Sequence, residues 1–197
     1  MARVGILGYQ GCIEPHERMF AQAGAETVRV RKAEDLDGID RLVLPGGEST
    51  TMLRFIDRYA LSQSIQTFAA SKPIWGICAG AILIAREVSN PTQRSLNLID
   101  IRATRNFYGS QLESFATTCE MPGLLGRSIV AQLIRAPRLS SLPQSSGRPQ
   151  LIVEGQIHGI DQTEQQPVFF SQGRVWASSF HVELGSDKAL HEAFLAL

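Results

Sequence analysis

An α/β domain with a mostly parallel central sheet and helices on both faces is the fold that this sequence predicts. In the first half of the chain, short apolar runs alternate with longer amphipathic segments. This alternation is typical of parallel strands joined by helices that pack on the sheet. The chain has 197 residues, which suits one core of this kind, and no linker divides it. We therefore expect a single domain over 1–197.

Glycine, proline and the spacing of apolar residues place the elements of the first half. The run RVGILG ends in glycine and suits a buried strand, and the next segment has Pro15 in a first-turn position and Gly24 at its end. From Ser49 to Ala70, apolar residues recur with helical spacing. The expected strands are 3–8, 27–32, 40–47 and 73–77, and the expected helices are 14–24, 49–70 and 79–88.

The second half is richer in strands. Its short β-rich runs are separated by glycine, proline and serine, so we expect some to extend the sheet and others to form a hairpin layer. The stretch 141–150 is the most loop-like and is expected to be disordered. A closing helix, 186–197, would be capped by Ser186. The expected strands lie within 96–105, 115–121, 128–136, 150–156, 167–172 and 174–180.

Composition argues against several classes of function. The 19 basic residues balance the 19 acidic ones, so no net field attracts nucleic acid or an anionic membrane. No apolar stretch approaches the roughly 20 residues of a membrane span, and the N-terminus reads as a strand rather than a signal peptide. The three cysteines lie far apart without metal-site spacing. We expect a cytoplasmic protein that carries no metal and no cofactor.

The first candidate for chemistry is Cys78, which lies between Gly76 and Gly80 in the pattern G-x-C-x-G. Flanking glycines allow a tight strand-to-helix turn that leaves the middle side chain exposed at the carboxyl end of the strand. The backbone N–H groups at the start of the helix then favour the nucleophilic thiolate. The alternative is an inert core thiol with glycines that serve packing. This segment alone leaves both interpretations open.

The second candidate is the pair His181 and Glu183 at the end of a predicted strand. Residues two apart in an extended chain project from the same face, so the carboxylate can fix the tautomer of the imidazole. A strand-end histidine beside a solvated glutamate is the simpler alternative. The cysteine elbow and the late H-x-E are more informative together, because a thiol hydrolase needs Cys and His from distant parts of the sequence.

The third candidate is the glycine turn LPGGEST at 44–50. It lacks the lysine of a phosphate-binding loop, so it does not favour nucleotide binding. Instead, the double glycine and Ala79 can offer backbone N–H groups to a developing oxyanion, and Glu48 can bind a substrate ammonium. The alternative is an ordinary glycine turn with Ser49 as a helix cap.

Together these segments resemble a known family. In this order and spacing, LPGGEST, GICAG and FHVE are similar to the class I (triad) glutamine amidotransferases, whose architecture is flavodoxin-like. GILGYQG, RNFYGSQLESF, IRAP and SFHVEL extend the similarity, over nearly the whole chain, to the glutaminase subunits of pyridoxal 5′-phosphate (vitamin B6) synthases. The resemblance implies hydrolysis of L-glutamine to L-glutamate and ammonia, which passes to the synthase subunit.

The resemblance also implies roles for individual residues. Cys78 would attack the glutamine amide and form a glutamyl thioester, His181 would transfer protons, and Glu183 would orient His181. The backbone of Gly47 and Ala79 would form the oxyanion hole. The implied glutamine-binding residues are Gly47, Glu48, Ser49, Arg105, Ile134 and Arg135.

In this family the glutaminase docks on a (β/α)₈-barrel synthase subunit within a large hetero-oligomer. The resemblance places Gln10, Gly11 and His16 near that interface and links them to activation. For His16, a solvent-exposed position in the first turn of a helix is the alternative. Cys12 and Cys119 match no catalytic position and are expected to be structural.

The sequence departs from the family pattern in two places. Val182 stands where the family usually has proline. The loss of that proline should loosen the turn, but it removes no catalytic atom. The segment 141–166 is longer than expected for the family, and an insertion there would lie near the interface with the synthase.

Three other functions are compatible with these patterns. The chain could serve another ammonia-transferring enzyme, such as the amidotransferase of histidine biosynthesis, although RNFYGSQLESF and IRAP argue against it. It could be a catalytically silent regulatory subunit, although it keeps Cys78, His181 and Glu183. It could also be a cysteine peptidase or amidase on a similar sheet.

Overall fold

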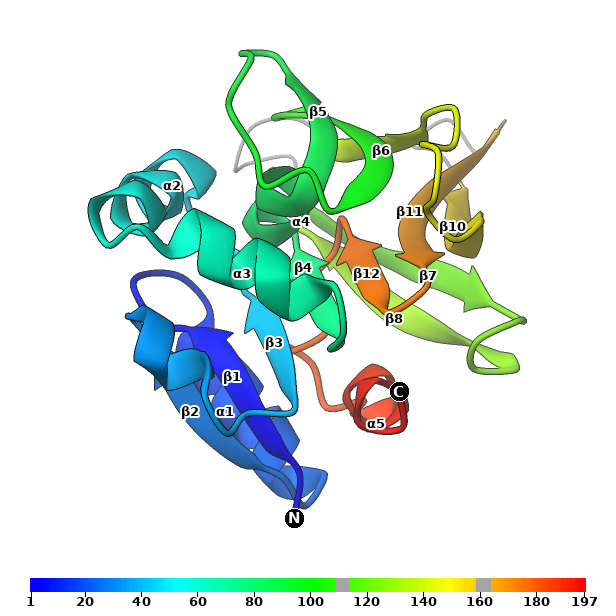
Figure 1. Cartoon of the computed structure of the whole chain (residues 1–197). Coiled ribbons are helices and arrows are strands. Elements are labelled where there is room, and N and C mark those ends of the chain that lie inside the picture. Colours follow the sequence, from blue (N-terminus) through cyan, green and yellow to red (C-terminus); the bar gives the residue numbers. More distant parts are fainter. Residues whose placement is uncertain (109–113, 159–163) are drawn as a thin grey trace.

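A nine-stranded sheet forms the centre of the protein (Figure 1). The structure is a computed structural model that describes residues 1–108, 114–158 and 164–197. Parts of the motif RNFYGSQLESF and of the segment 141–166 lie outside the described residues. In spatial order the strands are Glu26–Val30 (β2), Arg3–Leu7 (β1), Arg41–Leu44 (β3), Ile74–Ile77 (β4), Val175–Ser178 (β12), Gln165–Gln172 (β11), Leu151–His158 (β10), Phe115–Met121 (β7) and Arg127–Leu133 (β8).

The sheet has a parallel half and an antiparallel half. From β2 to β12 neighbouring strands run parallel, and from β12 to β8 each strand is antiparallel to its neighbour. The carboxyl ends of the parallel strands lie at one edge, so the loops that follow β1, β3, β4 and β12 meet there. These loops carry the candidate site. The predicted parallel core, extended by extra strands from the second half, is confirmed.

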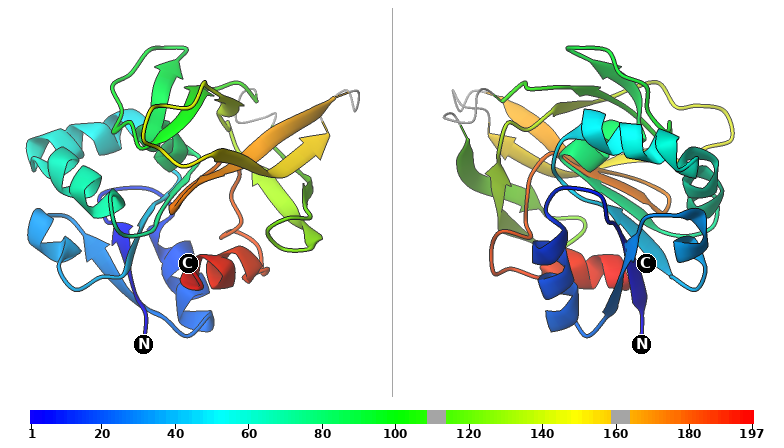
Figure 2. Two further views of the ribbon diagram at one scale, coloured as in Figure 1. Left: turned by 45° about the vertical axis from the view of Figure 1, so that its right-hand side comes forward. Right: turned by 90° about the vertical axis from the view of Figure 1, so that its left-hand side faces the viewer.

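Helices cover both faces of the parallel half (Figures 1 and 2). Side chains alternate along β3: Leu42 and Leu44 belong to one apolar core, and Val43 belongs to the other. The first core includes the buried faces of the helices Ser49–Arg58 (α2), Leu61–Ala69 (α3) and Ala79–Ile84 (α4). The second core includes those of Ile13–Gln22 (α1) and Ala189–Leu195 (α5). A short 3₁₀ helix, Ala33–Leu36 (η1), follows β2.

A second, three-stranded sheet lies beyond α4 (Figure 1). It consists of Ala85–Ser89 (β5), Ile99–Thr104 (β6) and Arg138–Ser141 (β9), with β5 and β6 parallel and β9 antiparallel to β6. The pattern of the sequence did not predict β5 or β9. The expectation that some short strands of the second half extend the main sheet is confirmed. The expected hairpin layer is wrong, because β5 and β6 are parallel and β6 and β9 lie far apart in the sequence.

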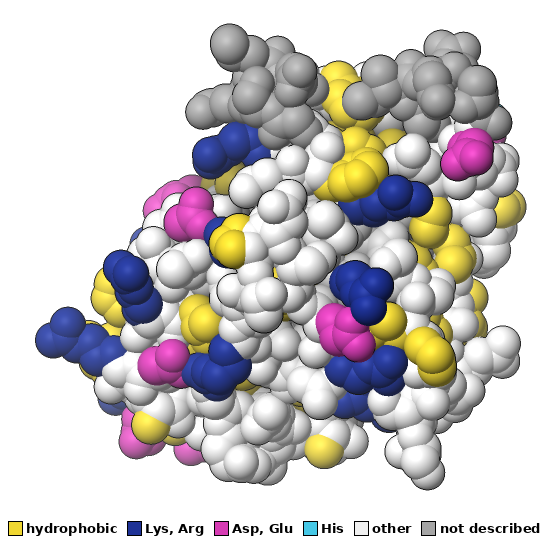
Figure 3. Space-filling model, turned by 90° about the horizontal axis from the view of Figure 1, so that it is seen from above, with side chains coloured by type: hydrophobic (Ala, Val, Ile, Leu, Met, Phe, Trp, Pro, Cys, Tyr) yellow, Lys and Arg dark blue, Asp and Glu magenta, His cyan; other side chains and the backbone are white. Residues whose placement is uncertain are grey.

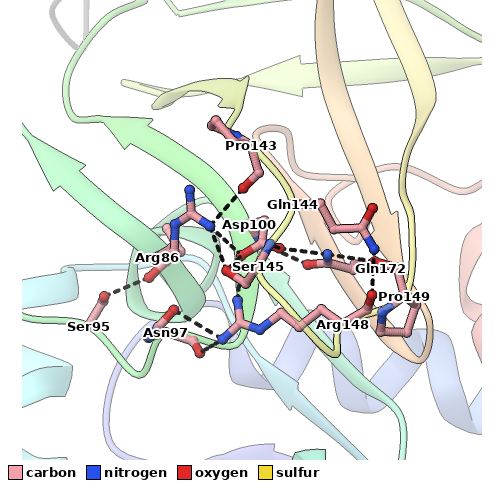
Figure 4. Close-up of polar contacts among 11 residues, drawn as sticks. Arg86, Ser95, Asn97, Asp100, Pro143, Gln144, Ser145, Arg148, Pro149 and Gln172 are labelled. Atoms are coloured by element: carbon pink, nitrogen blue, oxygen red, sulfur yellow. Dashed lines mark hydrogen bonds and ion pairs between the residues drawn. The ribbon is translucent and has the colours of Figure 1, made fainter.

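The buried carboxylate of Asp100 joins this second sheet to the loop after β9 (Figure 4). Its oxygens accept hydrogen bonds from Arg86, Arg148 and the backbone N–H of Ser145, at 2.7–2.8 Å. The Gln172 amide at the end of β11 also donates to Asp100, at 2.9 Å. The predicted disorder of 141–150 is therefore wrong. Long-range hydrogen bonds hold a stretch whose own sequence has no regular pattern.

The helices differ from the predicted ranges in three places. The single helix expected over 49–70 is two, since Ala60 adopts a left-handed conformation (φ +51°) and ends the first one. The helix expected over 79–88 ends at Ile84, where the chain enters β5. The last helix starts at Ala189, whose N–H bonds to the Asp187 carboxylate at 3.0 Å, so Ser186 is not its cap. Within the described residues, no helix is long and apolar enough to cross a membrane.

Candidate active site

Cys78 occupies the turn between β4 and α4. Its backbone has φ +50° and ψ −102°, a conformation that residues with side chains rarely adopt. This strained strand-to-helix turn is typical of a nucleophile elbow. The Cys78 N–H donates to the Ser178 carbonyl oxygen at 2.7 Å, which ties the turn to the end of β12. The thiol is thereby presented where the loops of the parallel strands meet.

The two glycines that flank Cys78 are required by close backbone contacts. A Cβ atom on Gly76 would lie 2.6 Å from the Gly80 carbonyl oxygen. A Cβ atom on Gly80 would collide with the Leu44 carbonyl oxygen at the end of β3. The pattern G-x-C-x-G therefore reflects tight packing of α4 on the sheet as well as presentation of the thiol.

His181 and Glu183 follow β12 and form a buried hydrogen-bonded pair. The His181 Nδ1 and Glu183 Oε1 atoms are 2.6 Å apart, and Glu183 is completely buried. The backbone N–H of His181 donates to the carbonyl oxygen of Gln132 in β8 at 2.8 Å, which holds this segment in place. His181 and Cys78 line the same pocket. Val182, in place of the usual proline, still allows this geometry.

The surroundings of the pair favour a protonated His181 and an ionised Glu183. Burial by itself lowers the pKa of His181, but the Cys12 and Cys78 thiols and the Glu183 carboxylate outweigh burial and raise it. Burial by itself raises the pKa of Glu183, but the hydrogen bond to His181 and the charge of that imidazole lower it. The carboxylate is therefore ionised at neutral pH, and it stabilises a proton on the imidazole.

The double-glycine loop after β3 packs directly on His181. A Cβ atom on Gly46 would overlap the His181 ring, so only glycine fits there. The Gly46 carbonyl oxygen accepts the Cys12 N–H at 2.9 Å. The Gln10 side chain accepts the Glu48 N–H at 2.8 Å. The loop after β1 therefore holds the glycine loop in its conformation.

Gly11 makes this contact between the two loops possible. It has φ +107°, and a Cβ atom there would overlap the Gly46 carbonyl oxygen. Gly47, the next residue of the glycine loop, lines the pocket opposite Ala79 at the start of α4. The backbone of both residues thus borders the space in front of the thiol.

Charged and polar groups also line the pocket. Arg105 lies 3.5 Å from the Glu48 carboxylate and 3.2 Å from the Thr50 hydroxyl. Ser49 donates from its hydroxyl to the side-chain oxygen of Gln93 at 3.1 Å, so it braces the start of α2 rather than capping it. A cation and an anion side by side match the two charges of an α-amino acid.

The pocket has a volume of about 230 Å³. This is below the roughly 300–1,000 Å³ of drug-sized ligand sites, as suits a ligand the size of an amino acid. The Ile134 carbonyl oxygen lies 4.0 Å from the Cys78 sulfur, and Arg135, with φ +46°, also lines the pocket. On the face seen from above in Figure 3, acidic side chains are interspersed among the basic ones.

The structure thus brings most of the predicted site residues to one cavity. Those that line it are Gln10, Gly47, Glu48, Ser49, Cys78, Ala79, Arg105, Ile134, Arg135 and His181. Glu183 lies behind His181, and Gly11 lies under the glycine loop. His16 is fully buried, 3.7 Å from Glu183, so the alternative of a solvent-exposed histidine is wrong.

Sequence reasoning missed Cys12. It was expected to be structural, yet it lines the pocket with its sulfur 3.9 Å from His181 Nδ1. The signal was its position two residues after Gln10, in the loop that follows the first parallel strand. Cys119, by contrast, is fully buried in β7, and burial raises its pKa to about 12, as suits a structural thiol.

Comparison with known proteins identifies the family. The SNO glutamine amidotransferase family matches residues 6–196. The chain belongs to this family. Relatives of the SNO chain include the pyridoxal 5′-phosphate synthase subunit PdxT of Geobacillus thermodenitrificans, 40% identical over 194 residues, covering 98% of this chain and 93% of the relative. The PdxT subunit of Kosmotoga olearia is 37% identical over 195 residues, covering 98% and 96%.

Solved structures agree with this membership. A crystal structure described as a glutamine amidotransferase has a TM-score of 0.85 and 36% identity, covering 98% of this SNO chain and 97% of its own. The structure of PurLQS from Thermotoga maritima, with a TM-score of 0.69 and 15% identity over 99% of this chain and 98% of its own, shares the fold alone. The predicted glutamine amidotransferase architecture is confirmed.

Proposed function

We propose that this SNO-family chain is a single-domain glutaminase that supplies ammonia to a pyridoxal 5′-phosphate synthase subunit. The observation that carries the proposal is the strained Cys78 elbow in one pocket with the buried His181–Glu183 pair. The names of the PdxT relatives support the substrate and the pathway. The opposite charges of Arg105 and Glu48, which line the same pocket, support an amino acid as substrate.

In the first half-reaction, Cys78 is the nucleophile. Its thiol gives its proton to His181, and the thiolate sulfur bonds to the side-chain amide carbon of glutamine. The backbone N–H groups of Gly47 and Ala79 stabilise the negative charge that develops on the amide oxygen. His181 then donates its proton to the amide nitrogen, the C–N bond breaks, and ammonia leaves a γ-glutamyl thioester on Cys78.

In the second half-reaction, His181 acts as a base toward water. It takes a proton from the water as the oxygen bonds to the thioester carbon. Collapse of the tetrahedral intermediate breaks the C–S bond, and the proton returns from His181 to the sulfur. The products are glutamate and the free Cys78 thiol, and Glu183 holds the imidazole in the required tautomer throughout.

The remaining pocket residues bind the amino-acid end of glutamine. Arg105 suits the α-carboxylate and Glu48 suits the α-ammonium, because each presents the opposite charge. Their contact with each other at 3.5 Å keeps both charges positioned before substrate enters. We assign the other contacts to the segment around Ser49 and to Ile134 and Arg135, which line the same cavity.

The proposed partner is a (β/α)₈-barrel synthase subunit, in a large cytoplasmic hetero-oligomer. The hydrogen bond from the Glu48 N–H to Gln10 supports a route for activation, since movement of the loop after β1 would reset the glycine loop. Gly11 belongs to that same loop contact. Because His16 is buried, a partner reaches it only through movement of α1.

Glutaminase assays with and without the synthase subunit test the proposal. We expect weak glutamine hydrolysis by the chain alone and a strong increase when the synthase is present. Cys78→Ala should abolish hydrolysis while preserving the fold and the binding of the synthase. A diazoketone analogue of glutamine should alkylate Cys78, which distinguishes a glutaminase from a peptidase.

Three results would contradict the proposal in different ways. Unchanged turnover in Cys78→Ala would overturn the catalytic assignment. Stimulation only by another ammonia-accepting enzyme would overturn the pathway. Full activity without the synthase would overturn the proposed activation through the loop after β1 and the glycine loop.

A further inference from the structure

Two buried histidines lie behind the pocket, and the reaction described above uses neither. His16 is on α1 and His191 is on α5, and both are completely shielded from solvent. The His16 Nδ1 and His191 Nε2 atoms are 3.0 Å apart, which is a hydrogen-bond distance. Two helices from opposite ends of the chain therefore meet through their imidazoles.

The other ring nitrogen of His16 faces the candidate active site. His16 Nε2 lies 3.7 Å from Glu183 Oε2, while Glu183 Oε1 bonds to His181. Among the described residues, the two facing atoms are buried side-chain atoms that lack any hydrogen-bond partner. The carboxylate therefore lies between two imidazoles, with one oxygen toward each. The distance exceeds a hydrogen bond here, and such contacts often tighten only when substrate binds.

Aromatic rings enclose the two histidines. The His191 ring centre lies 4.8 Å from that of Phe20 and 5.4 Å from that of Trp75. The same two rings lie 6.3 Å and 6.1 Å from the His16 ring. The ionisable groups that act on His16 are Glu183 and His181, and those that act on His191 are His16 and Glu183. In such an apolar enclosure, an N–H group without an acceptor is costly, so each proton needs a defined place.

One arrangement of protons satisfies these contacts. Burial lowers the pKa of His16, and it lowers that of His191 to about 3, so both rings are neutral at neutral pH. A neutral imidazole has one N–H, and a carboxylate only accepts. His16 therefore carries its hydrogen on Nε2, toward Glu183, and accepts on Nδ1. His191 then donates from its Nε2–H. Its Nδ1, which has no hydrogen-bond partner, is therefore the unprotonated nitrogen.

We propose that His191 and His16 form an outer relay that positions Glu183, so that a chain of four buried residues leads from α5 to the His181 imidazole. His16 is a positioning residue, since it does not line the pocket. When this contact tightens to a hydrogen bond with substrate bound, the His16 N–H holds Oε2, which stops the carboxylate from rotating and keeps Oε1 on His181 Nδ1. This inference rests on the proposed glutaminase function for its consequence, but the proton arrangement depends only on the distances, the apolar enclosure and the neutral state of the two rings.

The proton arrangement is tested by ¹⁵N NMR of the histidine rings in the full-length protein. We expect neutral Nε2–H tautomers for His16 and His191 between about pH 5 and pH 8, the range in which an ordinary histidine titrates. A proton on His16 Nδ1, or a positively charged His16 in this range, would overturn the relay. This measurement needs no enzymatic activity, so it separates failure of the relay from failure of the proposed function.

The positioning role is tested by kinetics of the complex with the synthase. His16→Leu removes the N–H and should lower kcat for glutamine hydrolysis about tenfold to hundredfold, as is usual when the support of a catalytic group is lost. KM should change by less than about twofold, because no substrate contact is removed. The downfield proton signal of the His181–Glu183 hydrogen bond should shift. His16→Gln, whose amide can donate to Glu183, should recover part of the rate.

Matched variants make the result specific. His191→Phe keeps the volume but leaves His16 Nδ1 without a donor, and it should lower kcat in the same way without touching Glu183. His158, an exposed histidine near Glu120, is the control, and His158→Leu should leave kcat unchanged. An unchanged kcat in a folded His16→Leu protein, or a loss that appears only in KM, would overturn the positioning role.

Discussion

Asp100 and Glu183 are both completely buried carboxylates, and they differ in what surrounds them. Asp100 accepts hydrogen bonds from two arginines, a serine and a glutamine, so both of its oxygens are satisfied (Figure 4). Within the part of the chain that the structure describes, Glu183 has one close side-chain partner, His181, and its second oxygen faces His16 at 3.7 Å.

This difference separates a structural carboxylate from a functional one. A carboxylate surrounded by fixed cations and amide donors cannot exchange protons with its neighbours, and it joins distant segments. A carboxylate that faces imidazoles orients groups that can gain and lose a proton. We therefore expect Asp100 variants to lose stability and Glu183 variants to lose activity.

The largest expected effect is on catalysis. Glu183→Gln should reduce kcat for glutamine hydrolysis by about 10³–10⁴-fold, because an amide no longer fixes the imidazole tautomer. The measurement is steady-state glutaminase activity in the presence of the synthase, with circular dichroism to show that the variant is folded. A loss below about tenfold would place Glu183 among the structural carboxylates.

The next effect is on stability. Asp100→Asn should lower the free energy of unfolding by about 3–5 kcal/mol, since it leaves Arg86 and Arg148 beside a neutral group. Urea unfolding measures the change, and kcat below the unfolding transition should stay close to that of the unchanged protein. Asp187→Asn is a suitable control, because its bidentate contact with Arg127 lies on the surface and should contribute less than about 1 kcal/mol.

The comparison also predicts a pH dependence of stability. Burial opposes ionisation of Asp100, but hydrogen bonds from Ser145 and Gln172 and the charge of Arg148 hold its pKa well below its ordinary value. A depressed folded-state pKa stabilises the fold above the unfolded pKa of about 3.9, and this stabilisation is lost as the pH falls further. Urea unfolding from pH 6 downward should show a steep loss below about pH 4 that is shallower in Asp100→Asn. If the free energy of unfolding fell equally steeply with pH in the unchanged protein and in Asp100→Asn, the assignment of this pH dependence to Asp100 would be wrong.

The smallest effect concerns Cys12, whose sulfur lies 3.9 Å from His181 Nδ1. The thiol raises the pKa of His181, so Cys12→Ala should move the basic limb of the kcat/KM profile, which marks loss of the imidazole proton, to lower pH. A thiol is a weak hydrogen-bonding group, so the maximal rate should change by less than about fivefold. A loss as large as that of Cys78→Ala would show that Cys12 takes part in the chemistry.

Local sequence patterns determined the framework of this protein and the position of its nucleophile. Apolar runs and glycine stops predict β1, β3 and β4, because strands buried on both faces need continuous apolar side chains. The G-x-C-x-G turn and the H-x-E pair are readable because their geometry arises from neighbours in the chain.

Only the tertiary structure decided the rest, because the deciding contacts join residues far apart in the sequence. The helix break at Ala60 and the early end of α4 override a helical pattern that continues in the sequence. Asp100 orders a loop some 45 residues away, which no local pattern encodes. The burial of His16 against Glu183 and His191 likewise depends on two helices packing together, and hydrophobic periodicity does not specify which buried polar atoms will meet.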